Sequence, residues 1–121
     1  MRVLVVDDEE MVQHLLQQAL EDFGCQVDVA SNGREALQRL TVHTYDLILT
    51  DIHMPYMSGV DFVRRLRQQG NRTPVVVMDS YPDVFLESDV GTEALATLVK
   101  PFDLCEVRRV LQEAQRLLIM R

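Results

Sequence analysis

The sequence is poor in the features that mark several large classes of protein. Its two cysteines, Cys25 and Cys105, stand far apart with no CxxC pair, which argues against a disulfide framework and against a zinc site. We expect both to be small packed side chains in a reducing compartment. The apolar run Val3-Leu4-Val5-Val6 is too short for a signal-peptide core or a membrane span. A cytoplasmic location with no membrane association is the expectation.

Basic residues are scarce relative to acidic ones. The 121 residues include 12 Lys and Arg against 19 Asp and Glu, which gives a formal net charge of −7. This sign repels phosphate backbones and anionic lipids, so we expect no direct binding of nucleic acid. Repeats and linkers are also lacking. With 47% hydrophobic residues, the chain is long enough to form one domain, residues 1–121, around its own core.

The sequence does contain a regular alternation of short apolar runs and longer amphipathic stretches. The stretches carry apolar residues three or four positions apart, which is the period of a helix. The apolar runs predict strands at residues 3–6, 27–30, 47–49 and 74–78, with a fifth that ends at 98–99. Five strand-helix units predict a parallel sheet with helices on both faces.

Local signals refine this pattern. Ser31 and Ser58 are candidate N-caps for the second and third helices. After the fourth strand the apolar residues hold no helical period and Gly91 interrupts them, so we expect a short or mobile helix there. The apolar run at 117–120 exceeds one buried stripe; core packing is the favoured interpretation and a partner-facing surface the alternative.

Charged side chains follow several predicted strands. Asp7 and Asp8 end the first strand, Asp51 the third and Asp79 the fourth, and Lys100 follows the fifth. In open parallel sheets, ligands bind beyond the carboxyl ends of the strands. Clustered carboxylates repel one another unless a hard cation lies among them, and Mg²⁺ suits oxygen ligands with room for water. The sequence therefore predicts a magnesium site at this edge.

Three segments together resemble the receiver domain of two-component response regulators. They are residues 3–9 (VLVVDDE), 51–59 (DIHMPYMSG) and 100–102 (KPF), in this order and at these separations. The resemblance covers essentially the whole chain. It implies a flavodoxin-like (βα)5 fold, a doubly wound parallel five-stranded sheet in a three-layer sandwich. It also implies a phosphoprotein that relays a signal and is not a turnover enzyme.

The resemblance assigns roles to the matching positions. It implies that Asp51 is the phosphoacceptor, which takes a phosphoryl group from a sensor histidine kinase, a phosphotransfer protein or a small phosphodonor. It implies that Asp8 binds Mg²⁺ directly and Asp7 through water, with Asp51 and the backbone carbonyl of His53 as further ligands. Lys100 is then the cation that pairs with the phosphoryl oxygens.

Elementary chemistry agrees with these roles. A carboxylate attacks phosphorus only if the charge on the equatorial oxygens is neutralised, and Mg²⁺ and an ammonium group can do this from opposite sides. The family also leads us to expect a cis peptide bond between Lys100 and Pro101.

The chain departs from the family at two switch positions. Receivers use a Ser or Thr hydroxyl after strand four, which moves to the phosphoryl group, and an aromatic residue in strand five, which follows it inward. Here the two positions hold Asp79 and Thr97. An ionised Asp79 only accepts hydrogen bonds. Three interpretations stay open: Asp79 joins the acidic metal cluster, which we favour; it is protonated and donates; or Ser80 replaces the hydroxyl.

Several functional alternatives follow. We expect Asp51 still to be phosphorylated, with altered coupling to the output. The alternative is a pseudo-receiver, a docking module whose output does not depend on phosphate, which the changes at Asp79 and Thr97 favour. The His53 side chain either lies over the phosphoryl group and tunes hydrolysis or is solvated in its loop. The sequence identifies neither the kinase nor the downstream effector, and self-association into a homodimer stays an open alternative.

Overall fold

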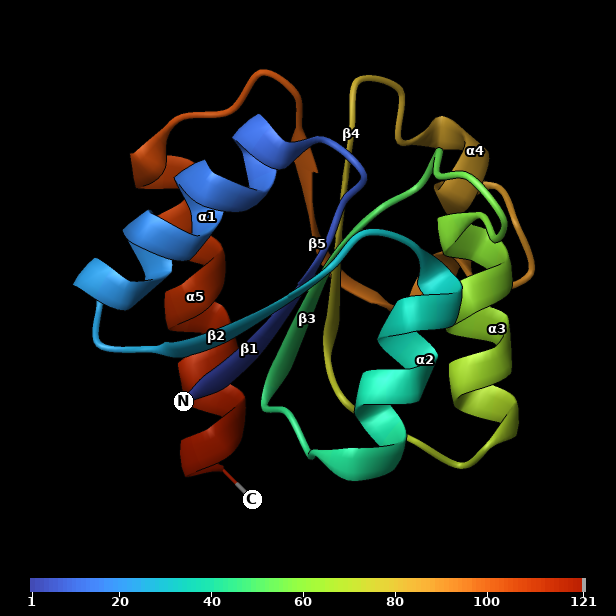
Figure 1. Ribbon diagram of the computed structural model, residues 1–121, viewed down its shortest axis with the longest axis horizontal. Coiled ribbons are helices and arrows are strands. Elements are labelled where there is room, and N and C mark those ends of the chain that lie inside the picture. Colours follow the sequence, from blue (N-terminus) through green and yellow to red (C-terminus); the bar gives the residue numbers. More distant parts are fainter. Residues whose placement is uncertain (121) are drawn as a thin grey trace.

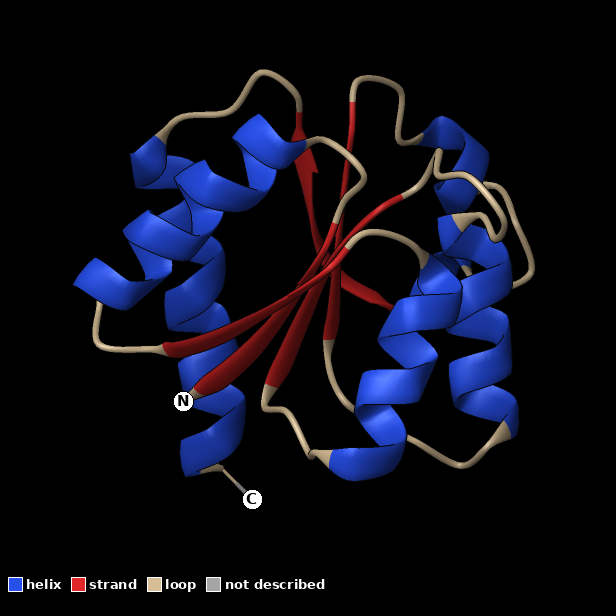
Figure 2. Cartoon of the chain, in the orientation of Figure 1, coloured by secondary structure: helices blue, strands red, loops and turns tan. Residues whose placement is uncertain are grey.

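The computed structural model describes residues 1–120 and contains one parallel sheet between two layers of helices (Figures 1 and 2). The strand order is β2-β1-β3-β4-β5. This confirms the predicted flavodoxin-like, doubly wound (βα)5 fold. The elements, in chain order, are β1 (Arg2–Val6), α1 (Glu10–Asp22), β2 (Gln26–Ala30), α2 (Gly33–Val42), β3 (Leu47–Asp51), α3 (Gly59–Gln68), β4 (Val75–Asp79), α4 (Asp83–Leu86), the 3₁₀ turn η1 (Gly91–Glu93), β5 (Ala94–Val99) and α5 (Leu104–Ile119).

The central strands are buried on both faces, as their unbroken apolar sequences require. Successive side chains of a strand point to opposite faces, so β1 contributes side chains to two hydrophobic cores, one on each face of the sheet. Val3 and Val5 pack in the core beneath α1 and α5. Leu4 and Val6 pack in the core beneath α2, α3 and α4. The polar ends of β1, β3 and β4 are thereby held between two packed layers.

Two helix starts illustrate how local sequence positions these layers. Ser58 caps α3 as predicted, since its hydroxyl oxygen accepts a hydrogen bond of 3.1 Å from the Asp61 N–H. The predicted Ser31 cap is wrong: Asn32 caps α2, and its Oδ1 accepts from the Glu35 N–H at 2.9 Å. Asn32 directly precedes the first helical residue, whereas Ser31 lies one residue too early to reach a free helix N–H.

The fourth unit is short, as predicted. α4 has only four residues, and η1 follows it before the chain enters β5. Ion pairs join this segment to α3: the Arg64 guanidinium donates to both carboxylate oxygens of Asp89 at 2.6 and 2.9 Å, and Arg67 Nε donates to Glu93 at 2.5 Å. Charged contacts to α3 therefore supplement the small apolar surface that so short a helix can bury.

Cys105 and the run at 117–120 are more exposed to solvent than the sequence predicts. Cys25 is buried as expected, but Cys105 is exposed; neither forms a disulfide within the described part of the chain. The 117–120 run is not core: Ile119 is 84% and Met120 80% exposed, because the buried stripe of α5 runs through Val107, Val110, Leu111 and Ala114. Among residues 1–120, no helix is both long and apolar enough to cross a membrane.

Candidate functional site

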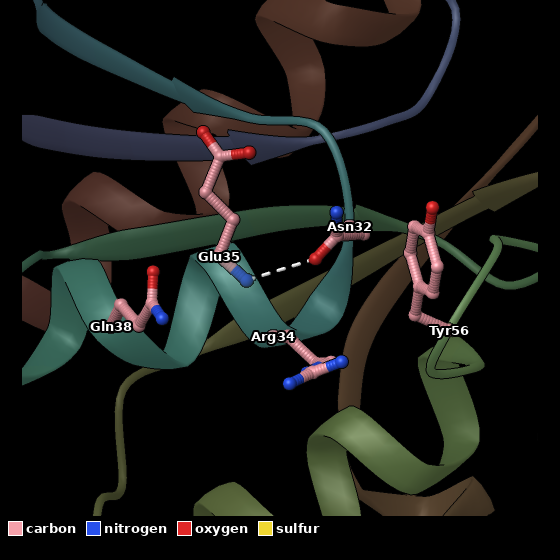
Figure 3. Close-up of a pocket in the computed structure, with 5 residues that line it drawn as sticks. All are labelled: Asn32, Arg34, Glu35, Gln38 and Tyr56. Atoms are coloured by element: carbon pink, nitrogen blue, oxygen red, sulfur yellow. Dashed lines mark hydrogen bonds between the residues drawn. The ribbon is translucent and has the colours of Figure 1, made fainter.

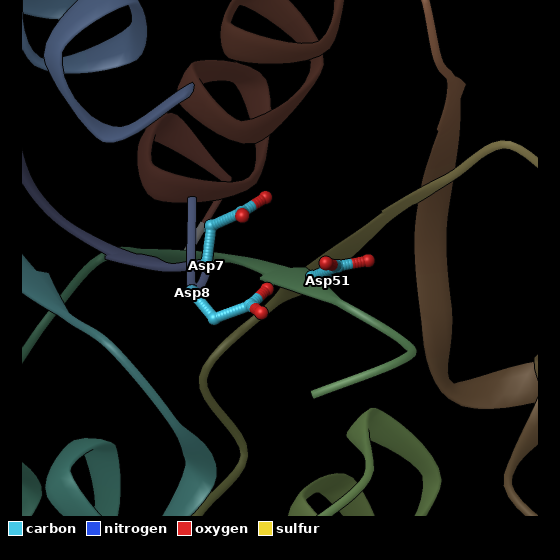
Figure 4. Close-up of side chains that lie close together, drawn as sticks. All are labelled: Asp7, Asp8 and Asp51. Carbon is cyan, nitrogen blue, oxygen red and sulfur yellow. The ribbon is translucent and has the colours of Figure 1, made fainter. Parts of the chain in front are cut away.

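Three carboxylates gather where β1 and β3 end. Asp7 directly follows β1 and Asp51 is the last residue of β3, and these two strands are neighbours in the sheet. Asp7 is fully buried, Asp51 is 4% exposed and Asp8 is exposed. One oxygen from each lies within 4.8 Å of the others (Figure 4). Two buried acids and one solvent-facing acid suit a hard cation that keeps part of its water shell.

Lys100 brings a positive charge to the same carboxylates. It follows β5, and its Nζ lies 2.8 Å from Asp7 Oδ2, 3.4 Å from Asp51 Oδ2 and 3.7 Å from Glu9 Oε1. The peptide bond from Lys100 to Pro101 is cis, which confirms the expectation. One ammonium group therefore faces three acids, and the site keeps an excess of negative charge.

The ionisation of the site reflects this excess. Burial and, next in importance, the charge of Asp7 raise the pKa of Asp51 to about 6, against the opposing charge of Lys100. Burial also raises the pKa of Asp7, although a hydrogen bond from Lys100 acts in the other direction. Burial alone would lower the pKa of Lys100, but its hydrogen bond and charge contacts with Asp7 outweigh this and raise it. A divalent cation would relieve the carboxylate repulsion.

Asp79 takes a different partner from the one expected. Its Oδ2 lies 2.7 Å from His53 Nδ1 and accepts from the Tyr81 N–H at 3.4 Å. The three-carboxylate cluster does not include Asp79. Asp79 is nonetheless close enough to Asp51 to contribute to the raised pKa of that residue, so an effect of Asp79 on metal affinity stays a prediction. The His53 side chain is 60% exposed and also contacts Asp79, and its role over the phosphoryl group stays a prediction.

Sequence reasoning weighed His53 and Asp79 separately and missed their pairing. They are 26 positions apart, and only the adjacency of β3 and β4 brings them together. A histidine just after one strand and an acid at the end of the next were the signal that could have found the pair.

The remaining predicted switch residues lie apart from this pair. Ser80 is exposed and lines a hollow of about 350 Å³ with Lys100 and Phe102, among others. Thr97 is half-buried in β5 and is the register partner of Val77 in β4. Neither position offers an aromatic side chain or a buried hydroxyl to the carboxylates.

A second hollow, of about 390 Å³, lies at the start of α2. It is lined by Asn32, Arg34, Glu35, Gln38 and Tyr56 (Figure 3). Asn32 is committed to the helix cap, as the dashed bond to the Glu35 N–H shows. None of Asp7, Asp8 or Asp51 lines this hollow, so the acidic cluster is the better candidate for chemistry.

Comparison with known proteins decides the family. The family model of the response regulator receiver domain matches residues 3–112 of the sequence. The chain belongs to the response regulator receiver family. The family predicted from three motifs is thereby confirmed, and the chain is a signalling domain of two-component systems.

Curated relatives are longer than this receiver. Regulatory protein AtoC of Escherichia coli is 36% identical over 99% of this chain but only 26% of its own length. The uncharacterized transcriptional regulatory protein YkoG of Bacillus subtilis is 36% identical over 94% of this chain and 50% of its own length. The receiver thus spans from about a quarter to half of these relatives.

Solved structures share the whole fold. The chemotaxis response regulator CheY4 of Vibrio cholerae is 32% identical, with a TM-score of 0.85 over 93% of this chain and 97% of that one. TrrA of Thermotoga maritima, solved in complex with Mg²⁺-BeF, is 30% identical with a TM-score of 0.84 over the same shares. The receiver domain of sensor histidine kinase PA1611 from Pseudomonas aeruginosa carries a magnesium ion in its active site cleft; it is 27% identical, with a TM-score of 0.84 over 93% of this chain and 94% of that one.

Proposed function

We propose that this receiver takes a phosphoryl group on Asp51, with Lys100 as the counter-ion of the transferred group. The observation that carries the proposal is the position of the Asp51 carboxylate. It lies within 4.8 Å of oxygens from Asp7 and Asp8 and 3.4 Å from Lys100 Nζ. Two acids that could hold a metal ion and an ammonium group therefore both adjoin the Asp51 carboxylate, which would act as the nucleophile.

The donor set fits Mg²⁺. Asp7, Asp8 and Asp51 supply only oxygen ligands, which this cation prefers, and the exposure of Asp8 leaves a solvent side for water and phosphate oxygens. The backbone carbonyl of His53 is proposed as a further ligand. When bound, Mg²⁺ would neutralise charge on the phosphoryl oxygens during transfer.

The residues of the chain perform the transfer itself. An Asp51 oxygen bonds to phosphorus while the bond from phosphorus to the donor breaks, and the donor group leaves with the electron pair. With a pKa of about 6, Asp51 is mostly ionised at neutral pH and so presents a nucleophilic carboxylate. Lys100, whose ammonium is compact and charged, pairs with the incoming oxygens.

We infer that the phosphodonor is a sensor histidine kinase or a phosphotransfer protein, with small acyl phosphates as substitutes in vitro. The names of relatives such as AtoC and YkoG describe regulators, the latter a transcriptional one. We propose that this domain signals onward through protein contact, since its own net charge of −7 disfavours nucleic acid. We also propose that the domain comprises all of residues 1–121, because α5 continues to Ile119 beyond the matched range.

Intact-mass measurement after incubation with Mg²⁺ and acetyl phosphate tests the proposal. The wild type should gain one phosphoryl group, and chelation of Mg²⁺ should prevent the gain. Asp51→Asn should abolish it and Lys100→Ala should reduce it strongly, whereas Asp22→Asn, which removes an exposed acid of α1, should leave it unchanged. No gain on the wild type would favour the phosphate-independent docking module, and an undiminished gain on Asp51→Asn would place the acceptor elsewhere.

A further inference from the structure

The proposed transfer to Asp51 assigns no role to the contact between His53 and Asp79. The Asp79 carboxylate is nearly buried, with 11% of the side chain exposed, whereas 60% of the His53 side chain is exposed. The bond of 2.7 Å joins Oδ2 of the acid to Nδ1 of the ring. The pair therefore has a buried carboxylate end and an imidazole end that water can reach.

An ionised Asp79 determines which ring nitrogen of His53 carries the proton. A carboxylate only accepts hydrogen bonds, so Asp79 Oδ2 accepts from the Tyr81 N–H and from the Nδ1–H of His53. In the neutral ring the lone pair is then on Nε2. A carboxylate that holds Nδ1–H in this way prepares Nε2 to take a proton, as in hydrolases with a Ser-His-Asp triad.

The pair adjoins the phosphoacceptor. His53 follows Asp51 by two residues, and Met78, the register partner of Asp51, directly precedes Asp79. The Asp79 carboxyl group is also close enough to Asp51 to contribute to the raised pKa of the latter. A phosphoryl group on Asp51 would therefore be a neighbour of the pair.

We propose that His53 and Asp79 form a dyad that hydrolyses the phosphoryl group of Asp51 and so limits the lifetime of the signal. This inference rests on the proposed function of Asp51. His53 is the catalytic residue, because its Nε2 takes a proton from the attacking water. Asp79 is a positioning residue, which holds the ring and its tautomer.

The step balances without any other reactant. The water oxygen bonds to phosphorus as the bond from phosphorus to Asp51 breaks, and Asp51 leaves as a carboxylate with the electron pair. The water proton passes to Nε2 and from there to solvent. The products are the free receiver and inorganic phosphate.

The dyad also explains what a carboxylate can do at a position where receivers have a hydroxyl. Asp79 cannot donate a hydrogen bond to a phosphoryl oxygen when ionised, but it can accept one from an imidazole. If His53 instead only shielded the phosphoryl group from water, its removal would speed hydrolysis. The dyad and the shield thus predict opposite signs for the same substitution.

The decay of the phosphorylated full chain tests the catalytic residue. After removal of acetyl phosphate, the loss of the adduct is followed by intact mass in the presence of Mg²⁺. His53→Ala should decay about a hundredfold more slowly, the lower end of what a general base contributes, and added imidazole should restore part of the rate. Phosphorus NMR should show inorganic phosphate and not phosphoimidazole. His14→Ala, an exposed histidine of α1, should decay like the wild type.

Two substitutions at Asp79 test the positioning role. Asp79→Asn and Asp79→Ala both remove the charge, but only the amide oxygen of Asn can still accept from Nδ1–H. Decay of the Ala variant should therefore be several-fold slower than that of the Asn variant. In the His53→Ala background the two should decay at the same rate, because the group they position is gone.

The outcomes separate the dyad from the proposed function. Unchanged or faster decay of His53→Ala would overturn the dyad while phosphorylation of Asp51 stands. A difference between the Asp79 variants that persists without His53 would overturn the positioning role. A wild type that gains no phosphoryl group would overturn both proposals.

Discussion

Two neighbouring connections at the carboxyl edge of the sheet contrast with each other. The connection from β3 to α3 keeps the receiver motif: Asp51 is buried, Ser58 caps the helix, and the Gly59 N–H donates to the Ile52 carbonyl at 2.7 Å. The connection that leaves β4 departs from it, with Asp79 in place of a hydroxyl and only a four-residue α4. The residues that would accept a phosphoryl group thus match the family pattern, whereas those that would transmit its presence to a partner do not.

This contrast indicates that chemistry and transmission are separable in one small domain. The three clustered carboxylates lie at the end of β3 or in the residues directly after β1, so none of them lies on α4. The changed connection meets the chemistry through the contact between His53 and Asp79. Changes on the β4 side are therefore expected to alter how long a phosphoryl group persists more than whether it is accepted.

Gly59→Ala should have the largest effect. A Cβ at Gly59 would lie 2.4 Å from the Asp51 carbonyl oxygen and 2.8 Å from the Ile52 Cα, both backbone atoms. Because neither can move without displacing Asp51, the unfolding free energy should fall by about 3 kcal/mol, the upper range of overpacking, and phosphorylation should fall with it. Urea denaturation and intact mass measure the two effects.

Gly91→Ala is the matched change on the other connection. Its Cβ would lie 2.1 Å from the Leu86 carbonyl oxygen, so some stability should also be lost. The segment it disturbs is the short α4 and η1, which contains none of the three clustered carboxylates, and the phosphorylation level should stay that of the wild type. Equal losses of phosphorylation in both glycine variants would break the comparison.

Asp51→Asn should stabilise the metal-free protein at neutral and higher pH. The folded-state pKa of about 6 lies above the ordinary value of about 3.9, so the folded state binds this proton more tightly than the unfolded state does. Ionised Asp51 therefore costs stability, on the order of 3 kcal/mol above pH 7, and the cost is relieved as the pH falls through 6 toward 4. Thermal unfolding across this range, in chelator, checks the sign.

The effect of Mg²⁺ on stability provides a control for Asp51→Asn. Mg²⁺ should stabilise the wild type and have little effect on Asp51→Asn. A stability difference between the two proteins that is constant from pH 4 to pH 8 would contradict the raised pKa and would mean that the acidic edge is less strained than its burial indicates.

Arg67→Ala should lower the free energy of unfolding by a smaller amount, by weakening the segment between β4 and β5. The Arg67 side chain is 13% exposed and donates to Glu93 and to the backbone carbonyls of Asn71 and Thr73. Removing these contacts should cost about 1 to 2 kcal/mol, measured by urea denaturation. Arg64→Ala removes an exposed ion pair to Asp89 and should cost less. Neither should change the level of phosphorylation, and a loss of phosphorylation with Arg67→Ala would show that the two connections are mechanically coupled.

Ser80→Ala should have the smallest effect of all. Ser80 is exposed and lies beyond the end of β4, so removing its hydroxyl should change neither adduct level nor decay, measured by intact mass. A clear change in decay would revive Ser80 as the residue that replaces the missing hydroxyl.

The sequence predicted the fold and the acid and lysine positions well because both depend on patterns that are local. Buried parallel strands need unbroken apolar runs, such as residues 3–6, and the order of five units leaves few topologies. The cis bond at Pro101 was expected only through the family resemblance. The cap at Asn32 was missed by one residue, since Ser and Asn are both good caps and their side-chain oxygens compete.

The contact between His53 and Asp79 could not be read from either residue alone. Like-charge reasoning placed Asp79 with the acids because it considered only carboxylates and a cation. The tertiary structure offered a nearer partner, an imidazole contributed by the adjacent strand's loop. Exposure of Ile119 and Met120 was missed for a related reason, because a composition count does not say which side of a helix a residue occupies.

The register of β4 and β5 constrains the order in which mutations could restore the usual receiver switch. Val77 pairs with Thr97, and Asp79 lies two residues beyond Val77 on the same strand, so side chains 79 and 97 belong to one face of the sheet. A hydroxyl at 79 has no aromatic neighbour to draw inward until 97 changes, and an aromatic residue at 97 meets a carboxylate until 79 changes. The two positions therefore have to change together. A protein with only one of the two replacements lacks half of the switch, and only the double replacement restores it.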